Sequence, residues 1–445
     1  MKKQILILII ANVFFTSLLF ANKHPQWVEN DSVEAIKYRI KSDFSLSIKD
    51  ASTELMRLYP SLEISKLREY INNHFLETMV IDGEERMHRK SPGNFKLLCP
   101  EYRGIWQGRG GNADAEDIDL VKNIVSLSDG KGSLNNGMRI KYRFFIDVPA
   151  HDFLKGDTIK VWMPIPIESA RQKNVKILSV SHPTYILSKN AESEHNTLYI
   201  EQPISTLSDS ILHFEYVGEY DVYAQFFSPE YITNNIKPYN KASKLYRKYT
   251  ALEHKHIIRD SLAFKIVGNE TCPFRQSELV YDYISKTFPW AGAREYSTIE
   301  SLPKYVLDEL HGDCGQVALL YISLMRTLGV PARWESGWML HPWSKNLHDW
   351  AEVYFEGVGW VPIDVSFGRF VNSHDKKIEC FYSSGMDCYR FATNTGICSP
   401  LYPQKKYIRS ETVDFQVGEV ECSKGNLFYP GWKKKLDVIS ITKLK

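Results

Sequence analysis

The stretch from His311 to Leu340, HGDCGQVALLYISLMRTLGVPARWESGWML, gives the clearest structural signal in the chain. After Asp313, apolar residues recur at intervals of three and four, at Val317, Leu320, Tyr321, Leu324, Met325 and Leu328. This spacing predicts a helix that starts at Asp313 and has one apolar face. Gly329 and Pro331 follow, as expected beyond a helix C-terminus. A strand-like segment then runs from Arg333 to Leu340.

Cys314 lies at the start of this predicted helix, within Gly312-Asp313-Cys314-Gly315-Gln316. A helix N-terminus stabilises an anion through its free N–H groups and its dipole, so this position lowers the pKa of a thiol. The flanking glycines allow the backbone of a substrate to approach closely. Taken alone, however, a cysteine here is more often a buried, inert residue or half of a disulfide.

Two further polar residues flank a predicted hairpin. His348 precedes the first of two strand-like segments, 350–356, and Asp364 stands near the end of the second, 359–365. A turn at Gly357-Val358 places both side chains at the same end of the hairpin. The helix that carries Cys314 can pack against this sheet with its N-terminus at that end. A thiol, an imidazole and a carboxylate would then meet as nucleophile, base and orienting group.

Four motifs in this order make the region resemble the transglutaminase-like superfamily. They are Gly312-Asp313-Cys314, Gly329-Val330-Pro331-Ala332-Arg333, His348-Asp349-Trp350-Ala351-Glu352-Val353-Tyr354 and Gly359-Trp360-Val361-Pro362-Ile363-Asp364, and the match covers roughly residues 275–370. The resemblance implies an α+β, papain-like fold in which the cysteine helix packs on an antiparallel sheet. It also implies that Cys314 is the nucleophile, His348 its acid/base partner and Asp364 the residue that orients the histidine.

The family also needs a donor for the oxyanion of the tetrahedral intermediate. The backbone N–H of Cys314 is one candidate. The resemblance suggests an upstream aromatic residue as another, here Trp290 or Tyr296, although packing explains both rings at least as well. Trp350 is expected to form a wall of the cleft. Gln316 follows Cys314 instead of preceding it, so it is not assigned to the oxyanion site.

The rest of the chain divides by composition and pattern. Residues 22–137 are predicted to be an N-terminal helical region that ends in a polar, glycine-rich linker or loop from about residue 91. Alternating apolar residues predict strands, and hence a β-sandwich domain at 138–230, with Pro164 and Pro166 marking an edge. The transglutaminase-like catalytic domain is expected at 240–400, and 401–445 should add strands that pack on the core.

The N-terminus has the pattern of a secretory signal peptide over residues 1–21. Lys2 and Lys3 precede an apolar stretch from Ile5 to Phe20, and Ala21 offers a cleavage site before Asn22. An uncleaved anchor is the less favoured alternative, because the apolar run is shorter than the ~20 residues of a spanning helix. We therefore expect an exported protein, periplasmic or secreted, with no integral membrane span in its mature chain.

Charge and cysteine content narrow the function further. The formal net charge is +2, and no basic run stands out, so nothing favours nucleic-acid binding. An odd number of cysteines, seven, leaves at least one thiol without a partner in the chain. The sequence allows one disulfide between two of Cys380, Cys388 and Cys398, or between one of them and Cys422, and it does not decide which. Their spacing is not that of a zinc site, and no cofactor or metal is predicted.

These observations predict an exported thiol acyl-transfer enzyme that acts on peptide or protein amides, with cell-wall peptide as one candidate by family analogy. Hydrolysis, as by a protease, amidase or deamidase, is favoured over cross-linking because water competes in any open cleft. The alternative is an inactive transglutaminase-like module that binds or acts as a scaffold at the cell envelope. The presence of all three triad residues argues against this alternative, because a site without catalytic activity could lose them.

Overall fold

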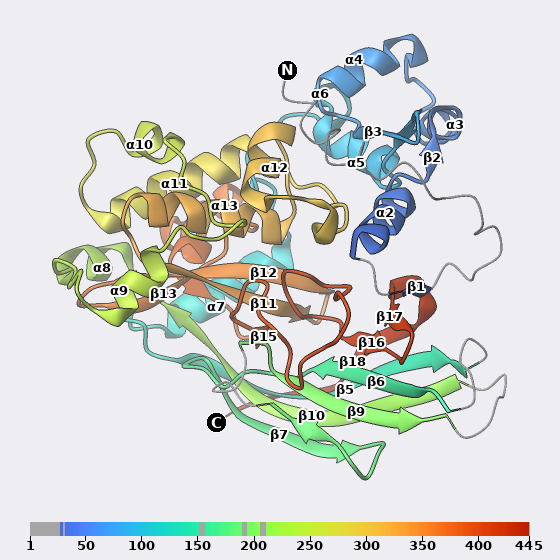
Figure 1. Ribbon diagram of the computed structural model, residues 1–445. Helices are drawn as coiled ribbons and strands as arrows, with labels where there is room; N and C mark the ends of the chain where they lie inside the picture. The colour runs from blue at the N-terminus through green and yellow to red at the C-terminus, as the bar shows by residue number, and fades with distance from the viewer. Residues whose placement is uncertain (1–26, 30–31, 151–155, 189–193, 205–210, 445) are drawn as a thin grey trace.

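A computed structural model describes residues 27–29, 32–150, 156–188, 194–204 and 211–444 (Figure 1). The expected signal peptide, residues 1–21, lies outside these ranges. The predicted α+β class is confirmed, with helices and several antiparallel sheets. Within the described ranges, no helix combines the length and the apolar character needed to cross a membrane.

Helix α13 (Cys314–Thr327) lies at the centre of the core. Asp313 is its N-cap: the Asp313 carboxylate accepts a hydrogen bond from the Gln316 N–H, and the Gln316 side chain accepts one from the Asp313 N–H, each at 3.0 Å. This reciprocal capping box fixes the first turn of the helix. The expectation of a single apolar face was too narrow, because 12 of its 14 residues are buried.

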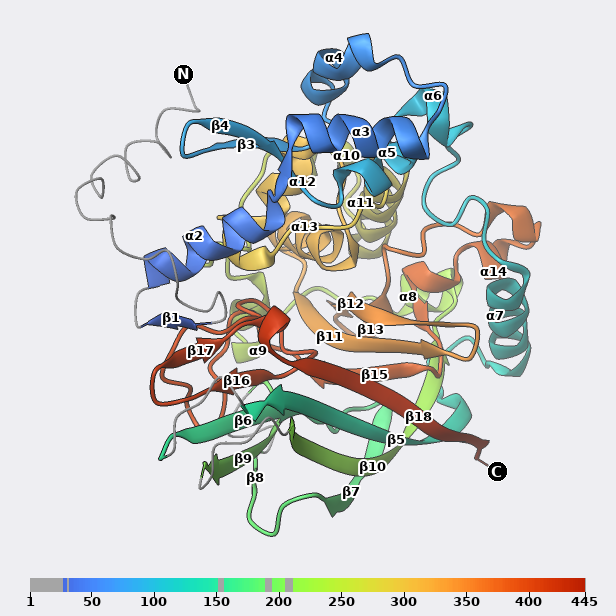
Figure 2. The same cartoon turned by 90° about the vertical axis from the view of Figure 1, so that its right-hand side faces the viewer.

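Helices and one sheet surround α13 on all sides, which explains its burial (Figures 1 and 2). The sheet has the antiparallel strand order β13-β12-β11-β15. Its strands are β11 (Ala332–His341), β12 (Ser344–Phe355), β13 (Gly359–Ile363) and β15 (Arg390–Asn394), and the helices are α9 (Lys244–Thr250), α10 (Leu262–Val267), α11 (Pro273–Thr287) and α12 (Leu302–Glu309). The hairpin of β12 and β13 turns where the sequence indicated, whereas β15 was not foreseen.

Two further sheets form the β-sandwich, with strand orders β1-β17-β16-β6-β9-β8 and β14-β10-β5-β18, and with β7 paired to β10. The strands of the first are β1 (Trp27–Glu29), β6 (Thr158–Pro164), β8 (Ile186–Leu187), β9 (Thr197–Pro203), β16 (Glu419–Glu421) and β17 (Gly425–Leu427). Those of the second are β5 (Asn135–Pro149), β7 (Gln172–Val180), β10 (Ile211–Phe226), β14 (Gly385–Met386) and β18 (Lys433–Lys443). The alternating apolar residues of β5 are buried between the sheets.

The proline-containing end of β6 is an edge, although the strand itself lies inside its sheet. β16 pairs with β6 only over Lys160–Trp162, so Pro164 has a partner strand, β9, on one side only. Proline cannot donate a ladder hydrogen bond, and this is where such a residue is tolerated.

The C-terminal strands do not pack where the sequence analysis placed them. They were expected against the catalytic core, but β16, β17 and β18 join the sheets of the sandwich, and β18 pairs with β5 along most of its length. The physical reason is that the long strand β5 leaves one edge open, which β18 fills with backbone hydrogen bonds. The sandwich is therefore completed by the last residues of the chain (Figure 2).

The N-terminal region is more ordered than the sequence analysis expected. Its elements are α2 (Ser32–Asp43), β2 (Leu46–Ser47), α3 (Ile48–Leu58), α4 (Leu67–Asn72), β3 (Thr78–Ile81), β4 (Glu84–Met87), α5 (Ser91–Leu98), α6 (Pro100–Arg103) and α7 (Ala115–Leu127). The predicted linker thus contains three helices. Val121 and Ile124 of α7 are buried at helical spacing, a signal that the surrounding glycines obscured.

The seven cysteines are all free thiols, so the disulfide left open for Cys380, Cys388, Cys398 and Cys422 is absent. Their positions explain this result. Cys422 is buried inside the sandwich, Cys388 lies in a cluster beside α7, and Cys398 packs against the core around α13. Two short helices not yet named lie at the periphery: α8 (Pro229–Asn235), at the left edge of Figure 1, and α14 (Lys376–Glu379), at the right edge of Figure 2.

Candidate active site

Cys314 is the first residue of α13, and its neighbours are packed closely around it. The Asp313 carboxylate that caps the helix also accepts a hydrogen bond from the Tyr296 hydroxyl at 2.6 Å. A Cβ atom at Gly315 would lie 2.3 Å from that hydroxyl and 2.6 Å from the Asp349 carboxylate. Gly315, which was expected to admit a substrate backbone, thus makes room for two side chains of the protein itself.

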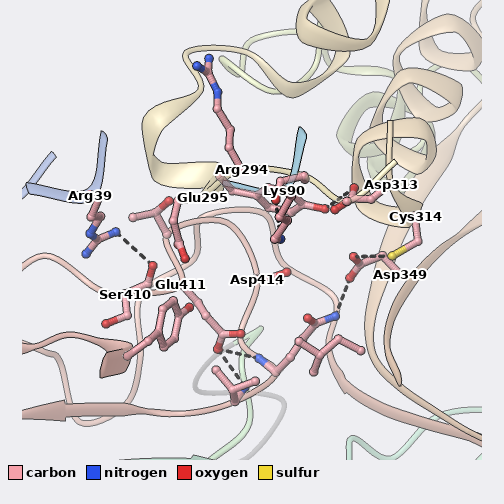
Figure 3. Close-up of a pocket in the computed structure, with 18 of the residues that line it drawn as sticks. Arg39, Lys90, Arg294, Glu295, Asp313, Cys314, Asp349, Ser410, Glu411 and Asp414 are labelled. Atoms are coloured by element: carbon pink, nitrogen blue, oxygen red, sulfur yellow. Dashed lines mark hydrogen bonds between the residues drawn. The ribbon is translucent and has the colours of Figure 1, made fainter. Parts of the chain in front are cut away.

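The Cys314 thiol donates a hydrogen bond to Oδ2 of Asp349, with 3.6 Å between sulfur and oxygen (Figure 3). Burial raises the pKa of this thiol well above its usual value, and the carboxylates of Asp349 and Asp313 raise it further. These effects outweigh the helix N-terminus, which the sequence analysis expected to lower that pKa. The group is therefore a thiol in this state, and it needs a base to become a nucleophile.

The imidazole of His348 lies at the end of the hairpin, where the sequence analysis placed it. His348 stands opposite Gly337 in the pairing of β12 with β11, and its Nε2 donates to Oδ2 of Asp364 at 2.7 Å. Asp364 follows β13 directly. Since Nε2 is engaged by the carboxylate, Nδ1 is the nitrogen that remains for proton exchange with another group.

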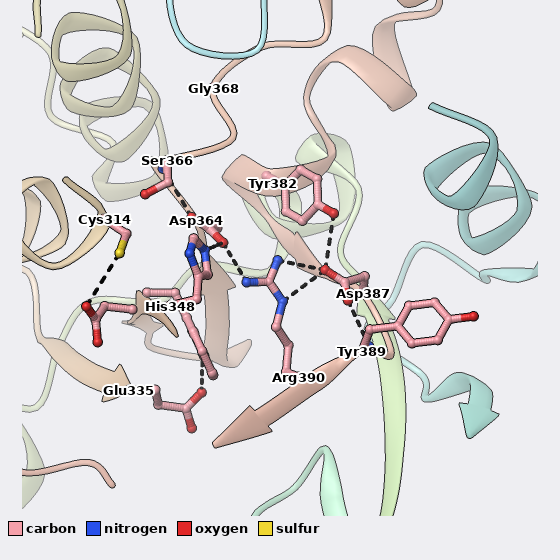
Figure 4. Close-up of polar contacts among 12 residues, drawn as sticks. Cys314, Glu335, His348, Asp364, Ser366, Gly368, Tyr382, Asp387, Tyr389 and Arg390 are labelled. Atoms are coloured by element: carbon pink, nitrogen blue, oxygen red, sulfur yellow. Dashed lines mark hydrogen bonds and ion pairs between the residues drawn. The ribbon is translucent and has the colours of Figure 1, made fainter. Parts of the chain in front are cut away.

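Asp364 is completely buried, yet it is held as an anion. Burial alone would raise the pKa of its carboxyl, but the charges of His348 and Arg390 together hold that pKa below its ordinary value. Arg390 Nη1 donates to Oδ2 at 2.9 Å, and the backbone N–H of Ser366 donates to Oδ1 at 3.1 Å. These contacts fix the carboxylate in position to orient the imidazole (Figure 4).

Arg390 extends this network away from the cavity. It lies on β15, is 1% exposed, and donates through Nε and Nη2 to Oδ2 of Asp387 at 2.9 and 2.7 Å. Asp387 also accepts from the Tyr382 hydroxyl at 3.1 Å. His348, Asp364, Arg390 and Asp387 thus form one buried chain of polar contacts (Figure 4).

Cys314 and His348 line the same cavity, whose volume is about 900 Å³. The core also contributes Asp349, α2 contributes Tyr38 and Arg39, and the C-terminal segment contributes Glu411, Asp414 and Lys434 (Figure 3). Three parts of the chain that are far apart in sequence therefore build one site. The structure brings Cys314 and His348 to this site, and the fully buried Asp364 contacts His348 without lining the cavity. The hydrogen bond of the sulfur goes to Asp349 instead of the imidazole.

The two candidate oxyanion donors differ in their surroundings. Trp290 lines the cavity and is 43% exposed, so its indole reaches the space that a substrate would occupy. The Tyr296 hydroxyl already donates to the Asp313 carboxylate and helps to fix the start of α13. Of the two side chains, Trp290 is the better placed to donate to a ligand.

Trp350 does not form the expected wall of the cleft. It is 1% exposed, and its ring stacks under that of His348 with 6.1 Å between ring centroids. Its indole N–H donates to the buried Glu335 at 2.6 Å, and Glu335 in turn pairs with Arg171 of the sandwich. Alternation along β12 explains this placement, because Trp350 lies on the opposite face of the strand from Ala351 and Val353, which pack in the cluster around α13.

The C-terminal segment supplies a second set of buried polar groups. The Gln416 side chain donates to Oδ1 of Asp349 at 2.8 Å and to the carbonyl of His348 at 3.2 Å. Burial, together with the nearby carboxylate of Asp414, raises the pKa of Asp349 and of Glu411 well above their usual values. Burial raises the pKa of Asp414 to about 7, against the opposing effect of Arg409.

Several residues of the site were missed from the sequence. Arg390, Asp387, Asp414 and Gln416 come from residues 366–445, which carry no periodic motif. Asp349 was interpreted only as structural, yet strand alternation held the signal. It shares a face of β12 with Ala351 and Val353, which pack in the cluster around α13, so this face points to Cys314. In the described part of the chain, no group of three or more His, Cys, Asp or Glu side chains is arranged to hold a metal ion.

Comparison with known proteins identifies the core. Residues 260–365 match the transglutaminase-like superfamily. This confirms the resemblance drawn from the motifs for that segment. The uncharacterized protein YebA of Bacillus subtilis (strain 168) is 25% identical over 194 residues, and the match covers 38% of this chain and 26% of YebA. The match thus spans about a quarter of the length of that relative.

Two solved structures have similar chains. One is from Cytophaga hutchinsonii and is provisionally named a cysteine protease; it has a TM-score of 0.46 and 16% identity, covering 71% of this chain and 94% of its own. The other is the periplasmic domain of TgpA from Pseudomonas aeruginosa, with a TM-score of 0.27 and 14% identity, covering 62% of this chain and 97% of its own. Both scores are too low for these likenesses to say anything about activity.

Proposed function

Because residues 260–365 form a transglutaminase-like core, we propose that this protein is a thiol acyl-transfer enzyme with Cys314 as nucleophile, His348 as acid and base, and Asp364 as orienting carboxylate. Its proposed substrates are peptide or protein amides, and its proposed reaction is hydrolysis. The observation that carries the proposal is the buried 2.7 Å contact from His348 Nε2 to Asp364, at a cavity that Cys314 and His348 share.

The proposed reaction begins with a proton transfer from the Cys314 thiol to Nδ1 of His348. The anionic Asp364 accepts from Nε2 and stabilises the imidazolium that forms. The thiolate then attacks the carbonyl carbon of the amide, and the electron pair of the C=O bond moves onto oxygen. The backbone N–H of Cys314 and the indole N–H of Trp290 are the proposed donors to this oxyanion.

Collapse of the tetrahedral intermediate breaks the C–N bond, and His348 gives its proton to the departing nitrogen. The acyl group remains on Cys314 as a thioester. A water molecule then attacks the thioester carbon while His348 accepts its proton. The C–S bond breaks with its electron pair going to sulfur, the carboxylic acid leaves, and His348 returns its proton to Cys314. An amine in place of water would give cross-linking by the same steps.

The size of the cavity supports water as the acceptor. Its volume is about 900 Å³, whereas a water molecule takes about 30 Å³ of liquid volume. A bound peptide side chain leaves room there for attacking water. Transamidation needs a shaped channel that delivers an amine and keeps water out.

The test compares two acceptors on one donor peptide. Purified protein is incubated with a glutamine-containing peptide, and ammonia release is measured beside incorporation of a fluorescent amine. We expect ammonia release to dominate and to vanish in Cys314→Ala and His348→Gln. Amine incorporation well above hydrolysis would reverse the proposed outcome, and no release of ammonia or peptide fragments from any peptide of a mixed library would remove the enzyme proposal.

One observation favours a second candidate, a transglutaminase-like module that binds without catalysis. The Cys314 sulfur bonds to the Asp349 carboxyl instead of the imidazole, and burial raises its pKa. A mild thiol alkylator separates the candidates, with Cys314→Ala identifying the labelled site. If the protein is an enzyme, the reagent should alkylate Cys314 faster than it alkylates a free peptide thiol at the same pH. If the protein is a binding module, it should not.

Export is part of the proposal and rests on the sequence of residues 1–21. Expression in a bacterium with an intact secretion pathway should give a periplasmic or secreted product. N-terminal sequencing of that product should begin at Asn22, and a full-length product in the cytoplasm would contradict the proposal. Within an exported site, cell-wall peptide is one candidate substrate.

A further inference from the structure

One loop of the N-terminal region enters the core next to the candidate site. It lies between α6 and α7 and carries Arg109. The backbone N–H of Arg109 donates to the carbonyl of Ser285 at 2.8 Å, and its own carbonyl accepts from the N–H of Arg369 at 3.1 Å. A Cβ atom on Gly368 would lie 1.8 Å from that carbonyl oxygen, and φ of Gly368 is +61°. The loop is therefore inserted so tightly that only glycine fits opposite it.

The side chain of Arg109 binds the two backbone segments that lead into the site. Its Nε donates to the carbonyl of Phe288 at 2.8 Å, and its Nη2 donates to the carbonyl of Gly312 at 2.6 Å and of Pro289 at 3.3 Å. Gly312 stands two positions before Cys314, and Pro289 directly precedes Trp290. One guanidinium thus sets the spacing between the nucleophile and the proposed oxyanion donor.

The backbone of Arg109 reaches the third part of the triad. Arg369, which donates to the Arg109 carbonyl, belongs to the segment that follows Asp364. The segments of Cys314, Trp290 and Asp364 therefore all contact this residue, which comes from a region outside the matched core. No other residue of the described N-terminal region is hydrogen-bonded to all three segments.

The charge of Arg109 needs an explanation beyond packing. The residue is 4% exposed, and within the described ranges no carboxylate lies within ion-pair distance of its guanidinium. Burial lowers its pKa to about 10, while the ionised form of Cys314 and the Asp313 carboxylate act in the opposite direction. It stays a cation at neutral pH. By reciprocity, this cation favours negative charge on the Cys314 sulfur.

We propose that Arg109 is a positioning residue of the candidate site, through which the N-terminal region holds the Cys314 and Trp290 segments together and places a positive charge behind the thiol. This inference rests on the proposed function, because it concerns the geometry and the ionisation of the same nucleophile. It assigns a role to a loop that the sequence analysis treated as part of a linker.

The test uses the full chain with Arg109→Met, Arg109→Lys and a matched control. Lys405→Met is the control, since Lys405 is also a buried cation but contacts Glu421 and Asn426 away from the cavity. The rate of alkylation of Cys314 is measured against pH. In Arg109→Met we expect the inflection to move to higher pH by about one unit, which lowers the rate near neutral pH about tenfold.

Arg109→Lys keeps the charge and loses the planar fork of donors. Its inflection should stay near that of the unchanged protein, while kcat for peptide hydrolysis falls and KM stays the same. Lys405→Met should lose stability without any change in the alkylation profile. This pattern separates a positioning role from general weakening of the fold.

The outcomes distinguish this inference from the proposed function. If the unchanged protein alkylates no faster than a free peptide thiol, the proposed function fails. If Cys314 of the unchanged protein is reactive but Arg109→Met and Lys405→Met show the same pH dependence of alkylation, the inference about Arg109 fails and the proposed function stands. If Arg109→Met does not fold, Arg109→Lys decides: wild-type kcat in that variant overturns the positioning role.

Discussion

Among single residues, Asp349 has the most direct influence on the reactive sulfur. Its carboxylate accepts the thiol hydrogen bond of Cys314, and after burial its charge is the largest influence that raises the pKa of that thiol. We therefore expect Asp349→Asn to lower that pKa. The inflection in the pH dependence of Cys314 alkylation should move to lower pH, with Cys314→Ala giving the background from the other six cysteines. An unchanged inflection would show that Asp349 does not control the thiol.

Arg390 is the residue whose loss should cost most stability. It balances Asp364 and Asp387, both fully buried, and removal of one partner of a buried ion pair costs about 3–5 kcal/mol. We expect a loss of this size in the free energy of unfolding of Arg390→Met, measured by urea titration. The double variant Arg390→Met with Asp387→Asn should recover part of the loss, because one unpaired carboxylate is removed. A loss below about 1 kcal/mol in the single variant would mean that the network is not balanced by Arg390.

At the scale of elements, the start of α13 tolerates no added side chain. Alanine normally stabilises a helix by up to about 1 kcal/mol relative to glycine. At Gly315, however, the new Cβ would clash with the Tyr296 hydroxyl and the Asp349 carboxylate. We therefore expect Gly315→Ala to lower the melting temperature and slow Cys314 alkylation, as followed by calorimetry and mass spectrometry.

Gly93 of α5 is the matched control for this prediction, because a Cβ atom there meets nothing within 4 Å. Gly93→Ala should leave the melting temperature unchanged or raise it, and should not affect alkylation. If both substitutions changed the melting temperature and the alkylation rate equally, the effect of Gly315→Ala could not be due to close packing at the start of α13.

Elements with local, periodic signals could be predicted from the sequence. Helix α13 and the turn between β12 and β13 were placed correctly because their apolar spacing and turn residues lie within a few positions. β12, however, begins at Ser344, so His348 lies within the strand and not before it. The contact of His348 with Asp364 followed from that hairpin. Strand β15 and helix α7 were missed, since one is a short buried strand without alternation and the other lies among glycines.

At the scale of the whole molecule, stability should depend on pH through carboxyls buried at the junction of its parts. Asp414 titrates near 3.8 when unfolded and near 7 in the fold. Between these values the folded state holds a proton that the unfolded state lacks, so stability falls as pH rises from about 4 to about 7. Asp414→Asn removes the part of this dependence that Asp414 contributes, while Asp349 and Glu411 keep theirs. Its melting temperature should equal that of the unchanged protein near pH 4 and exceed it by a few degrees near pH 8.

The exposed Asp119 provides the control for this prediction, because Asp119→Asn should shift the melting temperature little at either pH. Differential scanning calorimetry at both pH values checks the expectation. A constant difference between Asp414→Asn and the unchanged protein across this range would contradict it.

Contacts between distant parts of the chain were beyond prediction from one sequence. The sequence analysis left the role of the N-terminal region open and placed the C-terminal strands on the core. Neither the insertion of Arg109 behind Gly312 nor the approach of Gln416 to Asp349 has a local pattern. Such contacts depend on how whole sheets and helices dock, which is set by the sum of many weak surface complementarities.

The cavity is lined both by Tyr38 of α2 and by Lys434 of β18, which are far apart in the sequence. Synthesis of the chain must therefore pass β18 before the pocket is complete, and that strand must still add to its sheet. Domains form as units during synthesis, early segments first. Closure of the pocket around the Cys314 sulfur is thus delayed until β18 has been made and has paired with β5.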